Sequence, residues 1–437
     1  MPTAARSAFA ALALLAAPAV GLAQEPATAG YDEALRKLQA DFERRIAELE
    51  KKIAEQPSPK ATIEQALKGK WYEKIGLRGY TQFRYTTLFN KDMTPDLVVG
   101  NDSTVTEQDT FGIRRGRFIF SGNVTEHVYL YAQLDMFGTV GGAGDKGLQN
   151  RDLYADVAFD TDKEYRLRLG QSKVPFGFVN LQSSQNRAAM ERPEALNSAV
   201  EGERDLGVYF MWAPKEIRTL FSDLIKRGLK GSGDYGVVAI GAYSGQGLNR
   251  SDRNGEAHWI ARASYPWQFD NGQILELGIQ AYTGDFVVNT SGAVTAKADG
   301  IDDERAGLTA VLYPQPFGFE SEWVWGRGPE LNGAGTAVGR KSLDGGYVQF
   351  NYALETPKGN VFPFVRWNYY DGGRKFATNA PRDEVSELDL GFEWSPWPEL
   401  EVAVMYTHTF HRTNTRSAPY SDTEDEDRIG FQVQWNY

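Results

Sequence analysis

The stretch IGFQVQWNY, residues 429–437, decides the fold because apolar and polar residues alternate strictly along it. Ile, Phe, Val, Trp and Tyr occupy the odd positions, and Gly, Gln, Gln and Asn occupy the even ones. Successive side chains of a β-strand point to opposite faces, so the alternation predicts a strand with one wholly apolar face and one polar face.

The same alternation recurs outward from this segment through the chain from Trp71 onward. Long helical patterns do not separate the repeats, so we expect about sixteen strands. The other fifteen predicted strands are residues 75–88, 111–122, 127–137, 153–159, 164–171, 206–212, 235–243, 258–265, 273–283, 305–313, 317–326, 345–352, 361–370, 387–394 and 400–407.

The composition of the two faces indicates a membrane barrel. The apolar faces end in aromatics, as at Trp394 and Trp435, which suits a girdle at a membrane interface. The other faces carry Glu, Asp, Gln and Arg, which a dry core would not accept but a water-filled lumen would. We therefore expect an all-β fold, a transmembrane antiparallel β-barrel over residues 71–437. The alternative is a soluble secreted all-β protein.

The predicted connections also alternate in length. Short turns at 160–163 and 395–398 contrast with long polar loops at 371–385 and 409–427. Short periplasmic turns and long external loops are typical of outer-membrane barrels. The acidic run at 422–427 is then a solvated external loop, with divalent-cation binding as the alternative.

The first 70 residues are organised differently. Residues 1–23 combine Arg6, an apolar core and a small-residue end, which predicts a cleaved signal peptide rather than a retained anchor. Residues 24–70 hold a periplasmic amphipathic helix at 31–55, then a Pro linker and a second short helical piece at 61–67. The helix has one apolar stripe, which predicts a short coiled coil; folding onto the neighbouring domain is the alternative.

Overall composition excludes several classes of protein. The 437 residues include no Cys, which rules out disulfide scaffolds and thiol catalysis. A net charge of −11 argues against nucleic-acid binding, and a mean hydropathy of −0.46 against a bundle of membrane helices. No enzyme motif is present, and His408 and His411 would face opposite sides of a strand. We therefore predict no enzyme activity, no catalytic residue, no metal site and no cofactor.

Arginines alternate with apolar residues on three of the predicted strands, so their side chains should enter the lumen. A column of arginines attracts phosphate and carboxylate groups. The alternative is that they pair with acids across the lumen, with Asp135 and Asp156 as partners. The predicted anion path consists of Arg78, Arg84, Arg115, Arg117, Arg166 and Arg168.

The segment 171–205 is too long for a simple hairpin turn, so we expect it to fold into the barrel as a constriction loop. It holds four cations and five acids, and we expect the strand arginines to dominate because loop acids are free to turn outward. The cations are Lys173, Arg187, Arg192 and Arg204; the acids are Glu191, Glu194, Glu201, Glu203 and Asp205.

Several motifs between Phe111 and Phe210 resemble the phosphate-selective porin O and P family, namely FGIRRGRFIFSG, YLYAQLD, LRLGQSKVPFG, AMERPEALNSA and GERDLGVYF. The resemblance implies a sixteen-stranded, trimeric outer-membrane channel whose inward loop narrows the pore. It also implies an arginine ladder for anions at positions 115, 117, 166 and 168. The chain differs from the phosphate-selective members in keeping only Lys173 where they have a lysine-rich constriction.

Together these patterns predict a porin in the outer membrane of a Gram-negative bacterium, through which small anionic solutes such as phosphate diffuse passively. Its expected partners are outer-membrane lipids and two further copies in a homotrimer. A general, weakly selective diffusion porin is one alternative. A barrel anchor that contacts the cell wall through residues 31–56 is another.

Overall fold

The computed structural model describes residues 28–55, 70–89, 102, 104, 105, 110–136, 147–414 and 422–437. The chain divides into two units, Met1–Gly69 and Lys70–Tyr437. The predicted signal peptide, the Pro linker and the short helical piece at 61–67 lie outside the described residues. Each unit is considered by itself below.

The described part of the first unit is one helix, α2 (Thr28–Glu55), which confirms the predicted N-terminal helix. Pairs such as Glu33–Lys37 and Asp41–Arg45, four residues apart, stabilise its polar surface. Its apolar stripe is open in the single chain, since Leu38, Phe42, Ile46 and Leu49 are each more than half exposed. No helix among the described residues is long and apolar enough to cross a membrane.

The second unit begins with a short 3-10 helix, Trp71–Lys74, and then forms a single sheet. The strand segments described are β1 Gly76–Leu88, β2 Thr110–Asn123, β3 Val128–Asp135, β4 Gln149–Ala158, β5 Tyr165–Lys173, β6 Arg204–Trp212, β7 Val238–Tyr243, β8 His258–Gln268, β9 Ile274–Phe286, β10 Ile301–Leu312, β11 Phe317–Leu331, β12 Val338–Tyr352, β13 Leu354–Thr356, β14 Gly359–Gly373, β15 Arg382–Trp397, β16 Leu400–Asn414 and β17 Asp422–Asn436.

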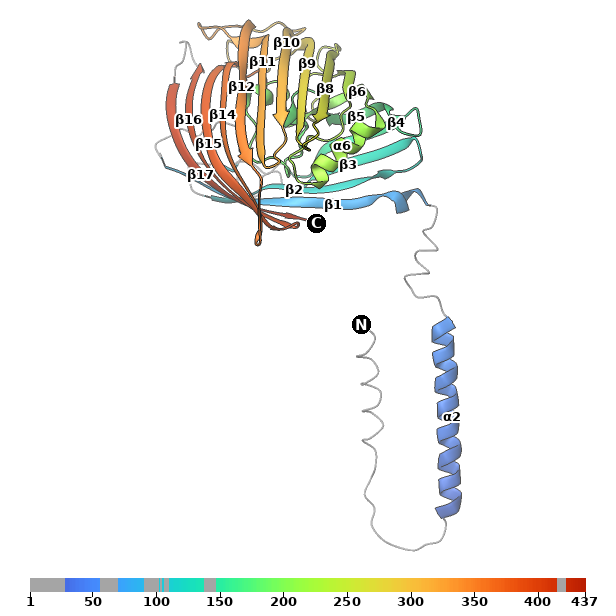
Figure 1. Cartoon of the computed structure of the whole chain (residues 1–437). Helices are drawn as coiled ribbons and strands as arrows, with labels where there is room; N and C mark the ends of the chain where they lie inside the picture. The colour runs from blue at the N-terminus through green and yellow to red at the C-terminus, as the bar shows by residue number, and fades with distance from the viewer. Residues whose placement is uncertain are drawn as a thin grey trace. The chain divides into compact units, whose positions relative to one another are not determined.

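Each strand pairs antiparallel with its neighbours in the chain, and β1 also pairs with β17, so the sheet closes on itself (Figure 1). Both β12 and β13 pair with β14, so these two segments form one interrupted strand and the described barrel has sixteen strands. This confirms the predicted fold. At the closure, the backbone N–H groups of Gly79 and Tyr437 donate to each other's carbonyl oxygens at 2.6 and 3.0 Å. A Cβ at Gly79 would lie 2.4 Å from the Tyr437 ring, so only glycine fits there.

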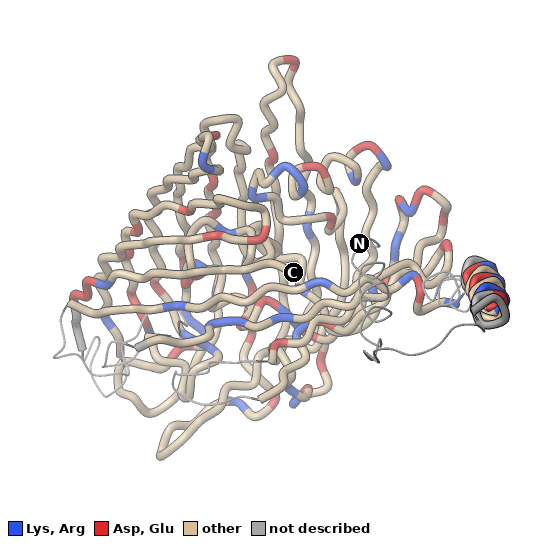
Figure 2. The backbone as a smooth tube through the Cα atoms, turned by 90° about the horizontal axis from the view of Figure 1, so that it is seen from below, with Lys and Arg blue, Asp and Glu red and all other residues tan. Residues whose placement is uncertain are grey.

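The two faces of the wall differ as the alternation predicts. Large apolar side chains outside the barrel are exposed, among them Leu77, Phe210, Trp259 and Trp435. Inward side chains are mostly polar and buried, because they meet one another and the inward segments. Acidic and basic positions are interspersed along the strands (Figure 2). An apolar exterior around a polar interior is what a barrel in lipid requires.

The connections alternate between short turns at one end of the barrel and longer loops at the other. The predicted long loops at 371–385 and 409–427 are shorter than expected, because β14 and β15 stay paired to Gly373–Arg382 and β16 and β17 to Thr413–Asp422. The acidic run at 422–427 is therefore strand rather than loop. Both faces of these strand ends are polar, so the period-two signal is lost there although the hydrogen-bond ladder continues.

One connection at the short-turn end breaks the pattern. Residues 213–237 contain a twelve-residue helix, α6 (Lys215–Lys226), where the sequence predicted no long helix. Its Phe221 and Leu224 are buried against Ile274 of β9 and Val311 of β10. The prediction was wrong because Ile217, Leu220, Phe221 and Leu224 follow the period of a helix within a region dominated by strands.

Candidate solute pathway and its constriction

The segment between β5 and β6 lies inside the barrel. It contains two short helices, α4 (Phe178–Leu181) and α5 (Glu194–Asn197), and a 3-10 turn at Glu201–Glu203, and most of its residues are buried. Its apolar side chains pack against a set of tyrosines on the inner wall. The resulting cluster includes Phe176, Val179, Leu196, Ala199, Tyr209, Tyr282, Tyr347 and Tyr370.

The part of this loop that follows β5 is fixed by one carboxylate of β11. The backbone N–H groups of Phe178 and Val179 donate to the two oxygens of Glu322 at 2.6 and 2.8 Å. Thr309 and Tyr347 also donate to Glu322, at 3.0 and 3.1 Å. Four donors therefore hold this buried carboxylate on the lumen side of the wall, and through it the start of α4.

Replacing this acid should loosen the constriction. In Glu322→Gln, one of the two oxygens that accept from α4 becomes an NH₂ group, which faces a buried N–H donor. We expect the loop anchor to weaken by about 1–3 kcal/mol, which should raise single-channel conductance and open-channel noise in a planar bilayer. Glu304→Gln is the matched control, because Glu304 is about half exposed and pairs with Arg340. An unchanged conductance and noise would contradict this role of Glu322.

Nearer the β1 and β2 wall, Glu191 of the loop contacts three arginines. Its oxygens lie 2.9 Å from Arg84 Nη1, 2.8 Å from Arg114 Nε and 3.0 Å from Arg115 Nη2. Asp102 also pairs with Arg84 and Arg114. Burial would raise the pKa of Glu191, but Arg114, Arg115 and Arg84 hold it well below its ordinary value. Three guanidinium groups thus meet two carboxylates.

A second carboxylate of the loop, Glu203, is shared by four cations. Lys173 Nζ, Arg187 Nη1 and Arg192 Nε lie 3.0, 3.0 and 3.1 Å from its oxygens, and Arg204 lies at 2.5 Å. Arg204 also pairs with Asp152 of β4 at 3.1 Å. Burial alone would raise the pKa of Glu203, whereas Lys173, Arg204 and Arg192 keep it well below the ordinary value.

The remaining arginines of the predicted path occupy different surroundings. Arg117 pairs with Asp135 at 3.1 Å and Arg168 with Asp156 at 2.7 Å, which is the pairing that the sequence left open. Arg166 pairs with Asp234 at 2.6 Å. Arg78 is exposed at the short-turn end and lines a cavity there.

The inward loop differs from its prediction in two respects. Its acids do not all turn outward, since Glu191, Glu194 and Glu203 are buried, and the first and third contact the cations that they were expected to leave free. The described strands also bound the inward segment at 174–203 rather than 171–205, since Lys173 ends β5 and Arg204 begins β6. The hydrogen-bonded ladder extends further than the sequence indicated.

Sequence reasoning missed Arg114 as a lumen residue. Gln82 pairs with Arg115 while Phe83 pairs with Ile113, so Arg114 is the extra residue of a β-bulge. The bulge directs both Arg114 and Arg115 inward, where each contacts Glu191. Strict alternation places consecutive residues on opposite faces and has no signal for this bulge.

The wall formed by β14 to β17, which adjoins β1, is richer in acids. Arg366 of β14 pairs with Asp389 at 2.6 Å, and Arg428 of β17 pairs with Glu387 at 2.8 Å and Glu426 at 3.2 Å. Glu387 also lies 3.7 Å from Arg366. In this group three carboxylates face two guanidinium groups, the reverse of the balance around Glu191.

A sixteen-stranded barrel with an apolar exterior, a charged interior and an inward loop defines an outer-membrane diffusion porin, which is a channel and not an enzyme. The chain belongs to the phosphate-selective porin O and P family, whose family model matches residues 94–437.

Solved structures agree on the fold. OmpF of Salmonella typhi, in a complex with daunomycin, has a TM-score of 0.54 at 12% identity, with 83% of this chain and 97% of that chain covered. OprB of Pseudomonas putida has a TM-score of 0.50 at 8% identity, with 86% and 96% covered. No curated protein sequence matches the chain. At these identities the structural likeness shows the fold alone.

Proposed function

We propose that this porin passes small anions in preference to cations, with phosphate among its solutes. The observation that carries the proposal is an excess of cations where the inward loop meets the wall formed by β1 to β6. Three cations surround Glu191 and Asp102, four surround Glu203 and Asp152, and Arg117 and Arg151 share Asp135. In each cluster the guanidinium and ammonium groups outnumber the carboxylates.

Cation clusters that are only partly neutralised by acids suit the passage of an anion better than a site that binds the anion tightly. A solute anion is attracted by the net positive charge, which raises its concentration in the narrow part of the pore. The acids already in each cluster compete for the same donors, so the anion is held weakly enough to leave, as conduction requires. The arginines of the path then attract anions while paired with carboxylates, and not as a row of unpaired charges. They are Arg115, Arg117, Arg166 and Arg168.

A planar bilayer under a KCl gradient tests this proposal through the sign of the zero-current potential. We expect the wild-type channel to prefer Cl⁻ over K⁺. Arg115→Gln should lower that preference, and Glu191→Gln should raise it, because the two changes shift the charge of one cluster in opposite directions. The change should be about fivefold if one charge alters the ion's energy by about 1 kcal/mol, the value for charges about 4 Å apart in water.

Two further outcomes of that experiment are informative. A preference for K⁺ in the wild type would refute the anion proposal and leave a general diffusion porin, which the acidic wall at Glu387 and Asp389 favours. Phosphate added to the chloride solution should reduce the Cl⁻ current if it shares the path. An unchanged current would remove phosphate from the proposed solutes.

The anion preference should fall as pH rises. Burial raises the pKa of Glu194 to about 7, against the opposing effect of Arg374, whose Nε lies 3.8 Å away. Burial lowers the pKa of Lys375, on the same connection as Arg374, to about 8, while Asp303 opposes this. As pH rises, Glu194 gains a negative charge and Lys375 then loses a positive one, so both changes make the pore less attractive to anions.

Zero-current potentials measured between about pH 6 and about pH 9 check this prediction. Glu194→Gln should reduce the part of the change near neutral pH and leave the later part in place. A Cl⁻ preference that rises with pH, or the same profile in Glu194→Gln, would show that another group controls the selectivity.

The same proposal includes export and assembly. Residues 1–23 would direct export and be cleaved, residues 24–70 would lie in the periplasm, and residues 71–437 would form the barrel. Three chains would associate, with their α2 helices packed through the stripe that contains Leu38, Phe42, Ile46 and Leu49. The support for this packing is that the stripe is exposed in the single chain.

A further inference from the structure

The connection between β6 and β7 carries a lysine into the barrel at the short-turn end. After α6, Gly228, Lys230, Gly233 and Gly236 all have positive φ, at 69°, 62°, 101° and 81°. Glycine adopts this conformation freely, but lysine does so only at a steric cost, because its Cβ approaches the following carbonyl oxygen. The backbone of Lys230 is held there partly by the Gln182 amide, which donates to its carbonyl oxygen at 2.6 Å.

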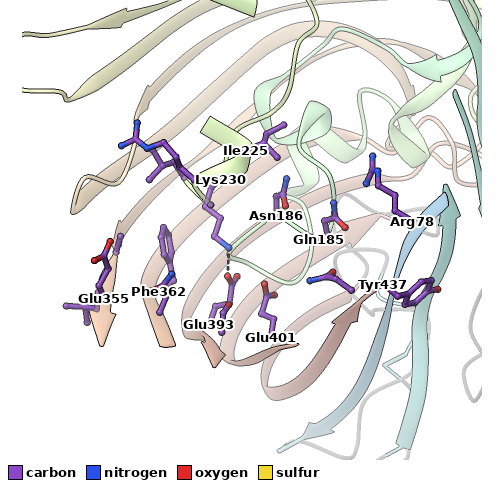
Figure 3. A pocket seen from close by; sticks show the side chains of 18 of the residues that line it. Arg78, Gln185, Asn186, Ile225, Lys230, Glu355, Phe362, Glu393, Glu401 and Tyr437 are labelled. Carbon is purple, nitrogen blue, oxygen red and sulfur yellow. Dashed lines mark hydrogen bonds and ion pairs between the residues drawn. The ribbon is translucent and has the colours of Figure 1, made fainter. Parts of the chain in front are cut away.

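The Lys230 ammonium meets groups from the opposite wall. Its Nζ donates to Glu393 of β15 and lies 5.0 Å from the centre of the Phe362 ring of β14 (Figure 3). The Glu401 carboxyl group of β16 lies beside that of Glu393. A carboxylate together with an aromatic face is the chemistry that recognises an organic ammonium group.

The charges in this group do not balance. Glu393 and Glu401 are both at least nine-tenths buried, and among the described residues the pair has one ammonium partner. The Oε2 atom of Glu393 is buried with no hydrogen-bond donor in the described part of the chain. Because an uncompensated buried charge is costly, a proton or a second cation must lie between the two carboxyl groups.

The pair borders a cavity of about 400 Å³ at the short-turn end. The lining includes Gln185 and Asn186 from the inward loop, Ile225 from α6 and Phe362 from the wall (Figure 3). Both polar amide groups and apolar surface are therefore available around the carboxylates. A volume of this size accommodates a small organic molecule.

We propose that Glu393, Glu401 and Phe362 form an ammonium-binding site at the short-turn mouth of the pore, which an amine-bearing solute occupies by displacing Lys230. The chain itself shows that an ammonium group fits, since Lys230 fills the site in this structure. Displacement breaks the contact between Lys230 and β15, while the Arg166–Asp234 pair still holds the 228–236 segment to β5. The site gives the pore a subsite for amines in addition to the basic clusters at the constriction.

Current block by 1,4-diaminobutane in a planar bilayer tests the site, with 1,4-butanediol as the uncharged probe. The diamine should block single wild-type channels, and more readily from one chamber because the site lies near one mouth; the diol should not. Glu401→Gln should weaken the block about tenfold, since it replaces a carboxyl group that can give up its proton to become a charged partner of the ammonium with a neutral amide. Glu355→Gln is the control, because Glu355 lines the same cavity but is exposed.

Lys230→Met provides the decisive comparison. It removes the competing ammonium, so the diamine should block this variant at lower concentration than it blocks the wild type. A gel mobility that changes when the sample is heated verifies that each variant barrel is folded. If Lys230→Met does not fold, Lys230→Gln replaces it. The proposal is overturned if the diamine blocks neither the wild type nor the Lys230 variant, or if it blocks Glu401→Gln as strongly as the wild type.

Discussion

Trypsin should cut the inward loop of folded Glu203→Gln protein after Arg187, whereas it should leave the wild-type loop intact. Arg187 and Arg192 are largely buried in the wild type and lie 3.0 and 3.1 Å from Glu203, but the bond after Arg192 resists trypsin because Pro193 follows it. The substitution removes the carboxylate that they share with Lys173 and Arg204, and leaves buried cations without their partner. Breaking a buried ion pair from one side costs about 3–5 kcal/mol, which is enough to displace the loop.

The barrel itself should survive this change, because the hydrogen-bond ladders of β5 and β6 do not involve the Glu203 side chain. Mass spectrometry of the fragments identifies the cut sites, and heat-dependent gel mobility reports on the barrel. Glu201→Gln is the matched control two residues away, since Glu201 pairs with Arg250 at 2.8 Å where both side chains are 37% exposed. Equal protection of the loop in both variants would contradict the role assigned to Glu203.

The reason that Glu203 was not singled out from the sequence is physical. Alternation predicts which strand residues face inward, because each strand residue has a fixed direction. A residue in a long loop has no such constraint, so Glu203 could be predicted as one of the acids of the loop, but its partners could not. Its position follows from Gly202 and Glu203 themselves, whose φ angles of 67° and 70° turn the chain into β6.

The barrel was predictable for the opposite reason. Period-two alternation is a local property, and it identified all sixteen strands, including the one at 429–437 that pairs with β1 across the closure. What alternation misses is any local departure from it. The bulge at Arg114 is one example, and α6 is another.

The lumen arginines show most clearly what period-two alternation cannot predict. Their inward direction was predicted, but their charge environment depends on residues distant in sequence. Arg84, for example, contacts Glu191 at 2.9 Å although 107 positions separate the two residues. Asp135 and Asp156 were named as partners because they lie on intervening strands, while Asp102 and Asp234 lie in connections for which alternation has no prediction.

The second large effect is expected in α2, where a single cysteine should link copies of the chain. The native sequence has no Cys, so an introduced thiol has no other partner within the protein. Leu49→Cys places the thiol on the exposed apolar stripe, and Ala40→Cys places it on the opposite face of the same helix. Mild oxidation should give predominantly disulfide-linked dimers for Leu49→Cys and few for Ala40→Cys.

The physical reason is the cost of leaving the stripe in water. Burying a Leu, Ile or Phe side chain stabilises an assembly by about 1.5–3 kcal/mol, and Leu38, Phe42, Ile46 and Leu49 together offer four such side chains. An isolated helix of this length gains little stability by itself, so most of it must come from packing. An amine-reactive cross-linker applied to the unmodified chain should give trimers as its largest product, since a disulfide joins only two of three helices. Equal disulfide formation at positions 49 and 40 would mean random collision, and the apolar stripe would then have to be covered by the alternative partner, the chain's own barrel.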